Sequence, residues 1–357
     1  MIEEACRASS AKLLVVRASG RLAVVKRASL AEMFDRGDLV IGNDAATLPA
    51  SLSGRHVESG AEIEVRLAGW IRAGDARRFV ALIFGAGDHR TATEDRPAPP
   101  PLALGDRLVF GPLTARIENF QGHPRLVSLR FAASGRTVMA GLARHGRPIQ
   151  YSHAPSPYAL WDVWTKFAAD PVAFEPPSAG FALDWAILSA WRRRGVGFAT
   201  LTHAAGLSST GDAALDRRLP LDEPYFIPDR TAISVREAKA RGARIVAVGT
   251  SVVRALESAA TPSGGLRSGA GLAHGRIGRG VAVGIADAIL TGVHRPGESH
   301  YELLRAFAPD EILDAAGRAL AEHGFKGHEF GDSVLIERAA APDAAFEPAT
   351  GALIAAG

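Results

Sequence analysis

The chain has a single cysteine, Cys6, and no apolar run long enough to cross a bilayer. One thiol cannot form a disulfide within the chain or a thiolate-rich metal site. A membrane-spanning helix needs about 20 predominantly apolar residues. The N-terminal segment MIEEACRASS starts acidic and lacks an apolar core, so neither secretion nor membrane insertion is expected. We therefore expect a protein of the reducing cytoplasm.

The chain also lacks a large excess of charge of either sign. Its 41 basic and 38 acidic side chains give a formal net charge of +3. This balance permits binding to nucleic acid but does not require it. With 47% hydrophobic and 22% charged residues, the composition is that of a globular protein, and 357 residues suffice for two domains or for one domain with an insertion.

Common cofactor signatures are absent from the sequence as well. There is no Walker loop, no HExxH and no paired CxxC. The segment GRIGRG at residues 275–280 lacks the spacing and the strand-to-helix context of a dinucleotide-binding loop. A P-loop enzyme, a zinc protease and a Rossmann dehydrogenase are therefore not expected.

The pattern of apolar runs and turn residues changes twice along the chain. Between about residues 52 and 131, short apolar runs separated by Gly, Pro or Asp predict a small β-barrel. From about residue 158, strand-like and helix-like segments alternate, which is typical of an α/β domain. The glycine-rich stretch from Gly264 to Gly280 is expected to be a loop.

These patterns predict the domain organisation. A large α/β domain comprises residues 1–51 and 148–340, and a small β-barrel domain of residues 52–147 interrupts it. Residues 341–357, which are rich in Ala, are expected to form a flexible tail. We find no internal repeat.

The segment RIVAVGTSVVRALES at 244–258 carries the clearest local signal. A β-branched run meets Gly249, and a helical pattern that contains Arg254 follows. Thr250 or Ser251 can cap this helix, and a helix N-terminus suits a polar or anionic ligand group. An ordinary turn between a strand and a helix is the alternative interpretation.

Segments in one consistent order over most of the chain resemble the family of S-adenosylmethionine:tRNA ribosyltransferase-isomerases, enzymes of queuosine biosynthesis. They are LVIGNDAATLPASL, GRPIQYSH, PPSAGF, LTHAAGL, EPYFIP, RIVAVGTSVVRALES, ILTGVHRPGES and FGDSVLI. The resemblance implies a large α/β domain, roughly a distorted barrel, interrupted by a small β-barrel. This agrees with the domain pattern predicted independently above.

The resemblance also implies a reaction. Members of the family use S-adenosylmethionine as a ribosyl donor, and the ribose unit moves to the aminomethyl group of a deazaguanine base in a tRNA anticodon loop. Adenine and methionine leave, and the sugar rearranges to an epoxycyclopentane. No metal is implied. Such chemistry needs a base for a ribose proton, an acid for the departing adenine, and polar groups that hold two substrates.

The resemblance further points to site residues. His203 and His294 occupy the family's histidine positions and are the expected catalytic residues, since imidazole titrates near neutrality. For each of the others, a turn, strand-edge or packing role is the alternative to substrate or donor binding. The expected binding residues are Asn43, Asp44, Tyr151, His153, Ser178, Gly180, Gly206, Glu223, Tyr225, Gly249, Thr250, Ser251 and Arg254.

The chain departs from the family pattern at several positions. Ala46 and Ser51 stand where the family motifs NDTRV and PAR have arginine, and Ala182 stands where AGLHF has histidine. Gly292 replaces the asparagine of NFHLP. Two alternatives therefore remain: a paralogue that binds a nucleoside or RNA without this chemistry, and an enzyme that uses the same donor on another acceptor. The oligomeric state is not indicated by the sequence.

Overall fold

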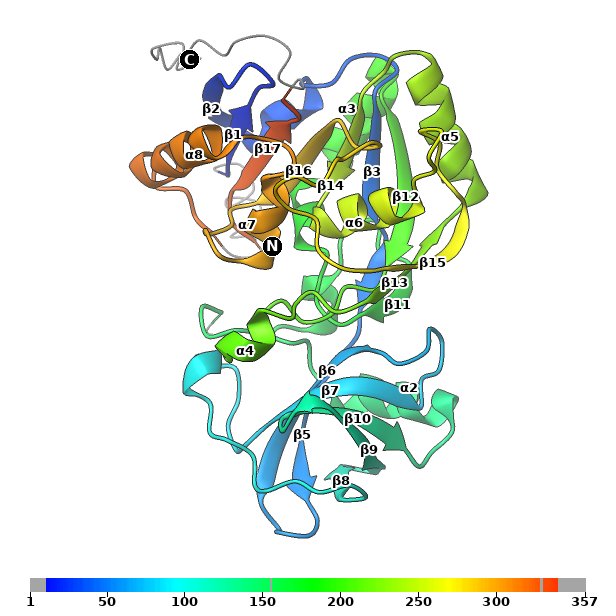
Figure 1. The fold of residues 1–357 in the computed structure, drawn as a ribbon, viewed down its shortest axis with the longest axis vertical. Coiled ribbons are helices and arrows are strands. Elements are labelled where there is room, and N and C mark those ends of the chain that lie inside the picture. The colour runs from blue at the N-terminus through cyan, green and yellow to red at the C-terminus, as the bar shows by residue number, and fades with distance from the viewer. Residues whose placement is uncertain (1–10, 155, 328–329, 340–357) are drawn as a thin grey trace.

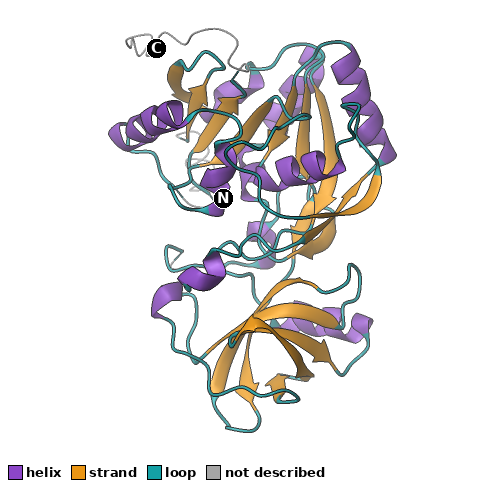
Figure 2. Ribbon diagram, viewed as in Figure 1, coloured by secondary structure: helices purple, strands orange, loops and turns teal. Residues whose placement is uncertain are grey.

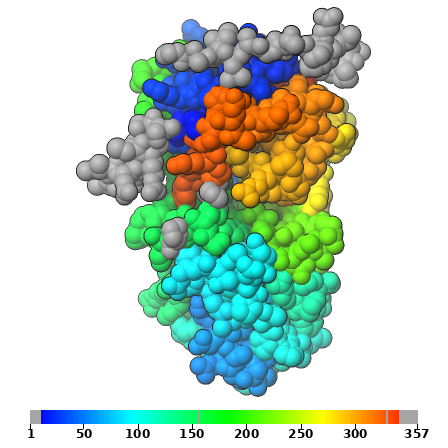
Figure 3. Space-filling view, turned by 90° about the vertical axis from the view of Figure 1, so that its left-hand side faces the viewer, coloured from blue at the N-terminus to red at the C-terminus, as the bar shows by residue number. Residues whose placement is uncertain are grey.

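The computed structural model describes residues 11–154, 156–327 and 330–339. Figure 1 shows two parts along the longest axis, an α/β part built on a large sheet and a separate β-barrel below it. In the space-filling view the barrel forms its own lobe (Figure 3). Among the described helices, none has both the length and the apolarity to cross a membrane. The expected tail of residues 341–357 lies outside the described residues.

The large sheet has nine strands in the order β15-β13-β12-β3-β14-β16-β17-β1-β2. At its centre β3 pairs in parallel with both β12 and β14, and β14 pairs in parallel with β16. The strands are β1 (Lys12–Val16), β2 (Leu22–Lys26), β3 (Leu39–Asn43), β12 (Gly197–His203), β13 (Glu223–Ile227), β14 (Ile245–Val248), β15 (Gly269–Ala273), β16 (Ala288–Gly292) and β17 (Ser333–Glu337).

Helices cover both faces of this sheet (Figure 2). Successive side chains of a strand point to opposite faces, so Leu39 and Ile41 enter one core while Val40 enters the other. Helices α5 (Asp229–Ala240), α6 (Thr250–Ala259) and α8 (Asp310–Glu322) contribute to the first core, and α3 (Trp185–Arg194) to the second. Burial on both faces explains why β3 and β14 are apolar along their length.

The smaller part is a closed barrel with the strand order β10-β7-β6-β5-β8-β9. Its core is apolar, and α2 (Gly135–His145) packs Val138 and Leu142 against it. The strands are β5 (Ser51–His56), β6 (Glu62–Trp70), β7 (Arg78–Phe84), β8 (Arg107–Phe110), β9 (Leu113–His123) and β10 (Leu126–Phe131).

Short elements join the two parts and cover their ends. The strands β4 (Ala45–Thr47) and β11 (Asp170–Ala173) form a two-stranded sheet of their own. The remaining helices are α4 (Ala213–Asp216), α7 (Ser299–Leu304) and the 3-10 turns η1 (Arg27–Ala31), η2 (Thr93–Asp95), η3 (Leu160–Val163) and η4 (Ser178–Ala182).

The predicted fold class, an α/β domain interrupted by a small β-barrel, is confirmed. In the larger domain the end strands β15 and β2 have no pairing with each other among the described residues, so the closed barrel is the small one. The prediction of a loop from Gly264 to Gly280 is wrong for the middle of this segment. Residues Gly269–Ala273 form β15, which pairs with β13, because backbone hydrogen bonds to a neighbouring strand outweigh the weak strand preference of glycine.

Candidate active site

A cavity of about 680 Å³ lies at the carboxyl ends of β12, β14 and β16. The segments that follow these strands, residues 204–209, 249–254 and 293–300, supply much of its wall. The barrel side adds Thr93 and Glu94. In open α/β sheets ligands bind outside the carboxyl ends of the strands. The position of the cavity therefore identifies it as the candidate active site.

The turn from β14 to α6 forms one wall. Gly249 has φ of 95°, a conformation that L side chains rarely adopt, and a Cβ there would lie 3.2 Å from the Cβ of Ala179. Gly249 is also the N-cap of α6, with no side-chain cap hydrogen bond. The predicted cap by Thr250 or Ser251 is thus wrong, since both residues already lie within the first helical turn.

A buried cluster of charged and polar groups lies beside this turn. Atom Oε2 of Glu223 is 3.5 Å from Nε of Arg254 and 3.5 Å from Nε2 of His203. The N–H of Gly206 donates to Oε1 of Glu223 at 2.6 Å, and Nη2 of Arg254 donates to two backbone carbonyls. Within the described chain, both ring nitrogens of His203 and two guanidinium nitrogens of Arg254 have no hydrogen-bond partner.

Burial sets the charge state of this cluster. Burial raises the pKa of Glu223 above its usual value, although Arg254 and the Gly206 amide act against it. Burial and the nearby Arg254 lower the pKa of His203 to about 3. Near neutral pH, His203 is therefore a neutral imidazole, and Glu223 is a carboxyl group that accepts a proton more readily than usual.

His203 is held in place by Asn43. The side-chain Oδ1 of Asn43 accepts from the backbone N–H of His203 at 2.9 Å, and its Nδ2 donates to the carbonyl of His203 at 2.9 Å and to Oγ of Ser251 at 3.2 Å. The next residue, Asp44, accepts from the hydroxyl of Thr202 at 2.7 Å. Asn43 and Asp44 therefore fix the ends of neighbouring strands, and neither borders the cavity.

Two further histidines, His294 and His300, border the cavity. Nε2 of His294 is 2.8 Å from the hydroxyl of Thr291, and its Nδ1 is 3.8 Å from Glu298. The ring of His300 stacks on His294, with centroids 4.9 Å apart and an interplanar angle of 15°. Sequence reasoning missed His300 and Glu298. The available signal was a second histidine six positions after His294.

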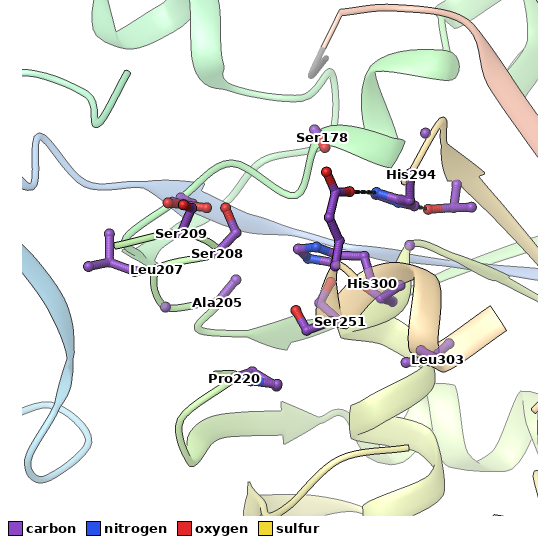
Figure 4. A pocket seen from close by; sticks show the side chains of 18 of the residues that line it. Ser178, Ala205, Leu207, Ser208, Ser209, Pro220, Ser251, His294, His300 and Leu303 are labelled. Carbon is purple, nitrogen blue, oxygen red and sulfur yellow. Dashed lines mark hydrogen bonds and ion pairs between the residues drawn. The ribbon is translucent and has the colours of Figure 1, made fainter. Parts of the chain in front are cut away.

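The opposite side of the cavity carries hydroxyls and a carboxylate. Figure 4 shows Ser208 and Ser209 facing His294 and His300 across the space. The phenol of Tyr151 donates a hydrogen bond to the buried carboxylate of Glu175. Burial and the charge of Glu175 raise the pKa of Tyr151. Glu175, which precedes the PPSAGF segment, was also missed from the sequence.

The structure brings most, but not all, of the predicted residues to the cavity. Gly180 packs against Thr165 and Phe167, and the ring of Tyr225 lies against Gly271. Predicted residues that border the cavity are Tyr151, His153, Ser178, Gly206, Glu223, Gly249, Thr250, Ser251, Arg254 and His294. Those that do not are Asn43, Asp44, Gly180, His203 and Tyr225.

One further cluster could hold a cation by composition. In the barrel, His56, Glu58 and Asp106 place ligand atoms within 4.8 Å of one another. However, the two ring nitrogens of His56 already contact Ser59 and Asp106, and Arg107 binds Glu58. Protein atoms thus satisfy this cluster, and its residues do not border the cavity.

Comparison with known proteins gives the family. The family model described as "Queuosine biosynthesis protein" matches residues 3–336. The chain belongs to this family. A relative from Sorangium cellulosum is 31% identical over 93% of each chain, and one from Citrifermentans bemidjiense is 33% identical over 93% of this chain and 94% of its own. Both are named S-adenosylmethionine:tRNA ribosyltransferase-isomerase.

A solved structure is also similar to the chain. It is the S-adenosylmethionine tRNA ribosyltransferase of Thermotoga maritima, with 22% identity, coverage of 92% of this chain and 93% of that chain, and a TM-score of 0.48.

Three positions where this queuosine biosynthesis family member departs from the family motifs lie away from the cavity. Ala46, Ser51 and Ala182 do not border it. Ser51 instead donates to the carboxylate of Glu64 at 2.7 Å, and the guanidinium groups of Arg66 and Arg96 bind the same carboxylate. Two arginines thus already surround this carboxylate, although position 51 is serine. Gly292, which stands where NFHLP has asparagine, does border the cavity, so one side-chain amide of the family pattern is missing from its wall.

Proposed function

We propose that the chain catalyses S-adenosylmethionine-dependent ribosyl transfer and isomerisation on a deazaguanine base in tRNA. The observation that carries this proposal is the buried cluster of His203, Glu223 and Arg254, which leaves polar atoms unpaired at the edge of a large cavity. Unpaired buried polar groups are costly and concentrate at functional sites. Family membership and the names of the relatives give the cavity its proposed substrates.

Glu223 is the group we assign to the first proton step. It borders the cavity, as Arg254 does, whereas His203 does not. Its raised pKa suits a general base. Glu223 takes a proton from the ribose carbon beside the sulfonium, and the electron pair of the broken C–H bond stays on that carbon. His203, predicted as catalytic, becomes a positioning residue that acts through Glu223.

The two substrates fit different walls. The start of α6 at Thr250 and Ser251 offers free backbone N–H groups and a positive dipole end, which suit the donor's carboxylate. Across the cavity, the carboxylate of Glu175 beside Ser208 suits the aminomethyl group and N–H edge of the acceptor base. His294, between the two walls, keeps its proposed role in proton transfer or positioning.

The rim of the cavity suits the backbone of an RNA. Arg276 and Arg295 are exposed and border the opening. Arginines bind phosphate groups in a sequence-independent way, and such contacts position a nucleic acid. We place the reaction in the cytoplasm, in line with the lone Cys6.

The decisive experiment measures adenine and methionine release from S-adenosylmethionine, with and without tRNA that carries the deazaguanine precursor. We expect release that depends on this tRNA. Binding of tRNA without release would favour a non-catalytic paralogue. Release that requires a different acceptor would favour an enzyme that uses the same donor elsewhere. The variant Arg254→Ala should weaken donor binding in a calorimetric titration, because without this cation the buried Glu223 takes up a proton more readily and loses the negative charge that attracts the donor's sulfonium.

A further inference from the structure

His300 lies at the start of α7 and borders the cavity, although no motif contains it. Among the described residues neither of its ring nitrogens has a hydrogen-bond partner, and neither is sealed within the protein. In Figure 4, His300 and His294 approach the cavity from the side opposite Ser208. The His300 ring thus has polar atoms open to a ligand.

His294 differs from His300 in this respect. Its Nε2 contacts the hydroxyl of Thr291 at 2.8 Å, and its Nδ1 faces Glu298 at 3.8 Å. A hydrogen bond therefore occupies Nε2 of His294, and a carboxylate lies near its Nδ1. Its ring forms a fixed flat surface against which His300 stacks at 4.9 Å.

The groups around His300 keep it neutral. Burial lowers its pKa to about 3, the nearby His294 and Arg254 act in the same direction, and Glu298 acts against them. A neutral imidazole has one N–H donor and one acceptor nitrogen. At neutral pH, His300 therefore offers a fixed hydrogen-bond donor rather than an exchangeable charge.

We propose that His300 is a further catalytic residue whose neutral ring donates a hydrogen bond to a ring nitrogen of the departing adenine. This inference rests on the proposed function. The N-glycosidic bond breaks, its electron pair goes to adenine, and the adjacent ribose oxygen shares a lone pair with the carbon left behind; the adenine takes up a proton from water after it leaves. His300 keeps its own proton throughout. A preorganised donor stabilises charge that develops on a leaving group, and a neutral imidazole can serve in this way.

His294 is then a positioning residue. Its contacts with Thr291 and Glu298 hold its ring, and the stacked geometry fixes the plane of His300. The leaving base meets a donor whose orientation is set before the bond breaks. Such preorganisation is the main source of this kind of stabilisation.

The test compares His300→Leu, which removes the donor, with His300→Gln, which keeps an N–H donor but cannot titrate. We expect His300→Leu to lower kcat for adenine release on the order of 10²-fold. His300→Gln should retain activity to within about tenfold of wild type, since one neutral hydrogen bond is replaced by another. KM for the donor should rise by no more than about tenfold in His300→Leu and change little in His300→Gln. His145→Leu, an exposed histidine of the barrel, is the matched control.

A binding measurement separates this inference from the proposed function. Calorimetric titration with adenine alone should show affinity reduced on the order of tenfold in His300→Leu and nearly unchanged in His300→Gln. If wild type turns over no donor, the proposed function fails, and the adenine titration still decides the role of His300. Equal losses in the Leu and Gln variants, or full adenine affinity and turnover in His300→Leu, would overturn the inference.

Discussion

In the barrel, the carboxylate of Glu64 accepts hydrogen bonds from three side chains, whereas beside the cavity the carboxylate of Glu223 accepts one, from the Gly206 amide, among the described residues. Both carboxylates are buried and both lie near arginine. The two clusters therefore use the same residue types in different ways.

In the barrel both oxygens of the Glu64 carboxylate accept hydrogen bonds, although Nη1 of Arg66 and Nε of Arg96 have no partner among the described residues. Burial alone would raise the pKa of Glu64, but Arg66 and Arg96 hold it below its usual value. The two guanidinium groups also lie over the ring of Phe84, at 5.0 and 5.1 Å from its centroid. A buried carboxylate with this many donors is fixed and charged. The cluster is part of the structure of the barrel.

Beside the cavity only one oxygen of the Glu223 carboxylate accepts a hydrogen bond, from the Gly206 amide, among the described residues. The nearest nitrogens of Arg254 and His203 stand 3.5 Å from Glu223, and the pKa of the carboxyl group is raised rather than lowered. Burial of a charged group alone therefore does not identify a functional site. An incompletely paired carboxylate at the wall of a cavity indicates one, because a substrate can supply the missing partner.

The largest expected effect comes from breaking the barrel cluster. Glu64→Ala leaves two buried guanidinium groups without their carboxylate, and removing one partner of a buried ion pair costs about 3–5 kcal/mol. We expect the free energy of unfolding in urea to fall by this amount. The control, Glu118→Ala, removes a partly exposed partner of Arg78 and Arg130 and should cost no more than about 1 kcal/mol. Equal unfolding midpoints for the Glu64 variant and wild type would contradict the structural role.

The opposite result is expected beside the cavity. Glu223→Gln should lower adenine release on the order of 10²-fold, the usual contribution of a general base. The free energy of unfolding should fall less than for Glu64→Ala, because glutamine keeps an oxygen for the Gly206 amide and removes a charge that burial disfavours, although Arg254 loses its ion-pair partner. Asp222→Asn changes the adjacent, exposed carboxylate and should keep full activity. A Glu223→Gln enzyme with wild-type turnover would remove the residue from the mechanism.

The sequence predicts the scaffold better than the orientation of its side chains. The apolar runs of β3 and β14 and the short strands of the barrel follow from hydrophobic pattern alone, because pattern is set by burial. β15 escaped prediction, since GAGLA has no alternation of apolar and polar residues. Its partner β13 supplies the hydrogen bonds that make it a strand.

The candidate site shows the same limit. Motif resemblance selects Asn43 and His203, but it cannot tell that both lie behind the wall of the cavity. Glu175 and His300 also border the cavity, and the spacing of His300 from His294 is only a weak local signal, because their positions depend on how distant segments meet in three dimensions. Spacing within one segment carries no information about such contacts.

The pH dependence of stability sharpens the comparison further. The pKa of His203 is about 3 in the folded chain and about 6.5 in an unfolded one, so the unfolded state binds more protons between these values. Stability should therefore fall as pH drops from about 6.5 toward 3, by at most about 1.4 kcal/mol per pH unit for this one group.

His203→Gln should remove that part of the slope, measured as urea unfolding of both proteins across the pH range. Glu223 changes stability in the opposite direction. Because its pKa is raised, the folded state binds more protons than the unfolded state above about pH 4.5, so its contribution to stability falls as pH rises. The comparison of wild type with the single variant cancels the other carboxyl groups. Parallel pH profiles for the two proteins would show that His203 titrates normally.

The smallest expected effect tests the link between scaffold and cavity. Ser251 accepts a 3.2 Å hydrogen bond from Nδ2 of Asn43, which also donates to the carbonyl of His203 at 2.9 Å. Ser251→Ala removes the longer contact only, so the free energy of unfolding should fall by about 1 kcal/mol or less. Ser234→Ala, on the exposed face of α5, serves as the control and should change stability by no more than about 0.5 kcal/mol.

Ser251 also borders the cavity, so adenine release is measured in parallel. We expect small losses of both stability and activity, because the hydroxyl bonds to Asn43 and not to the substrate. A loss of activity many times larger than the loss of stability would mean that this hydroxyl contacts the substrate directly.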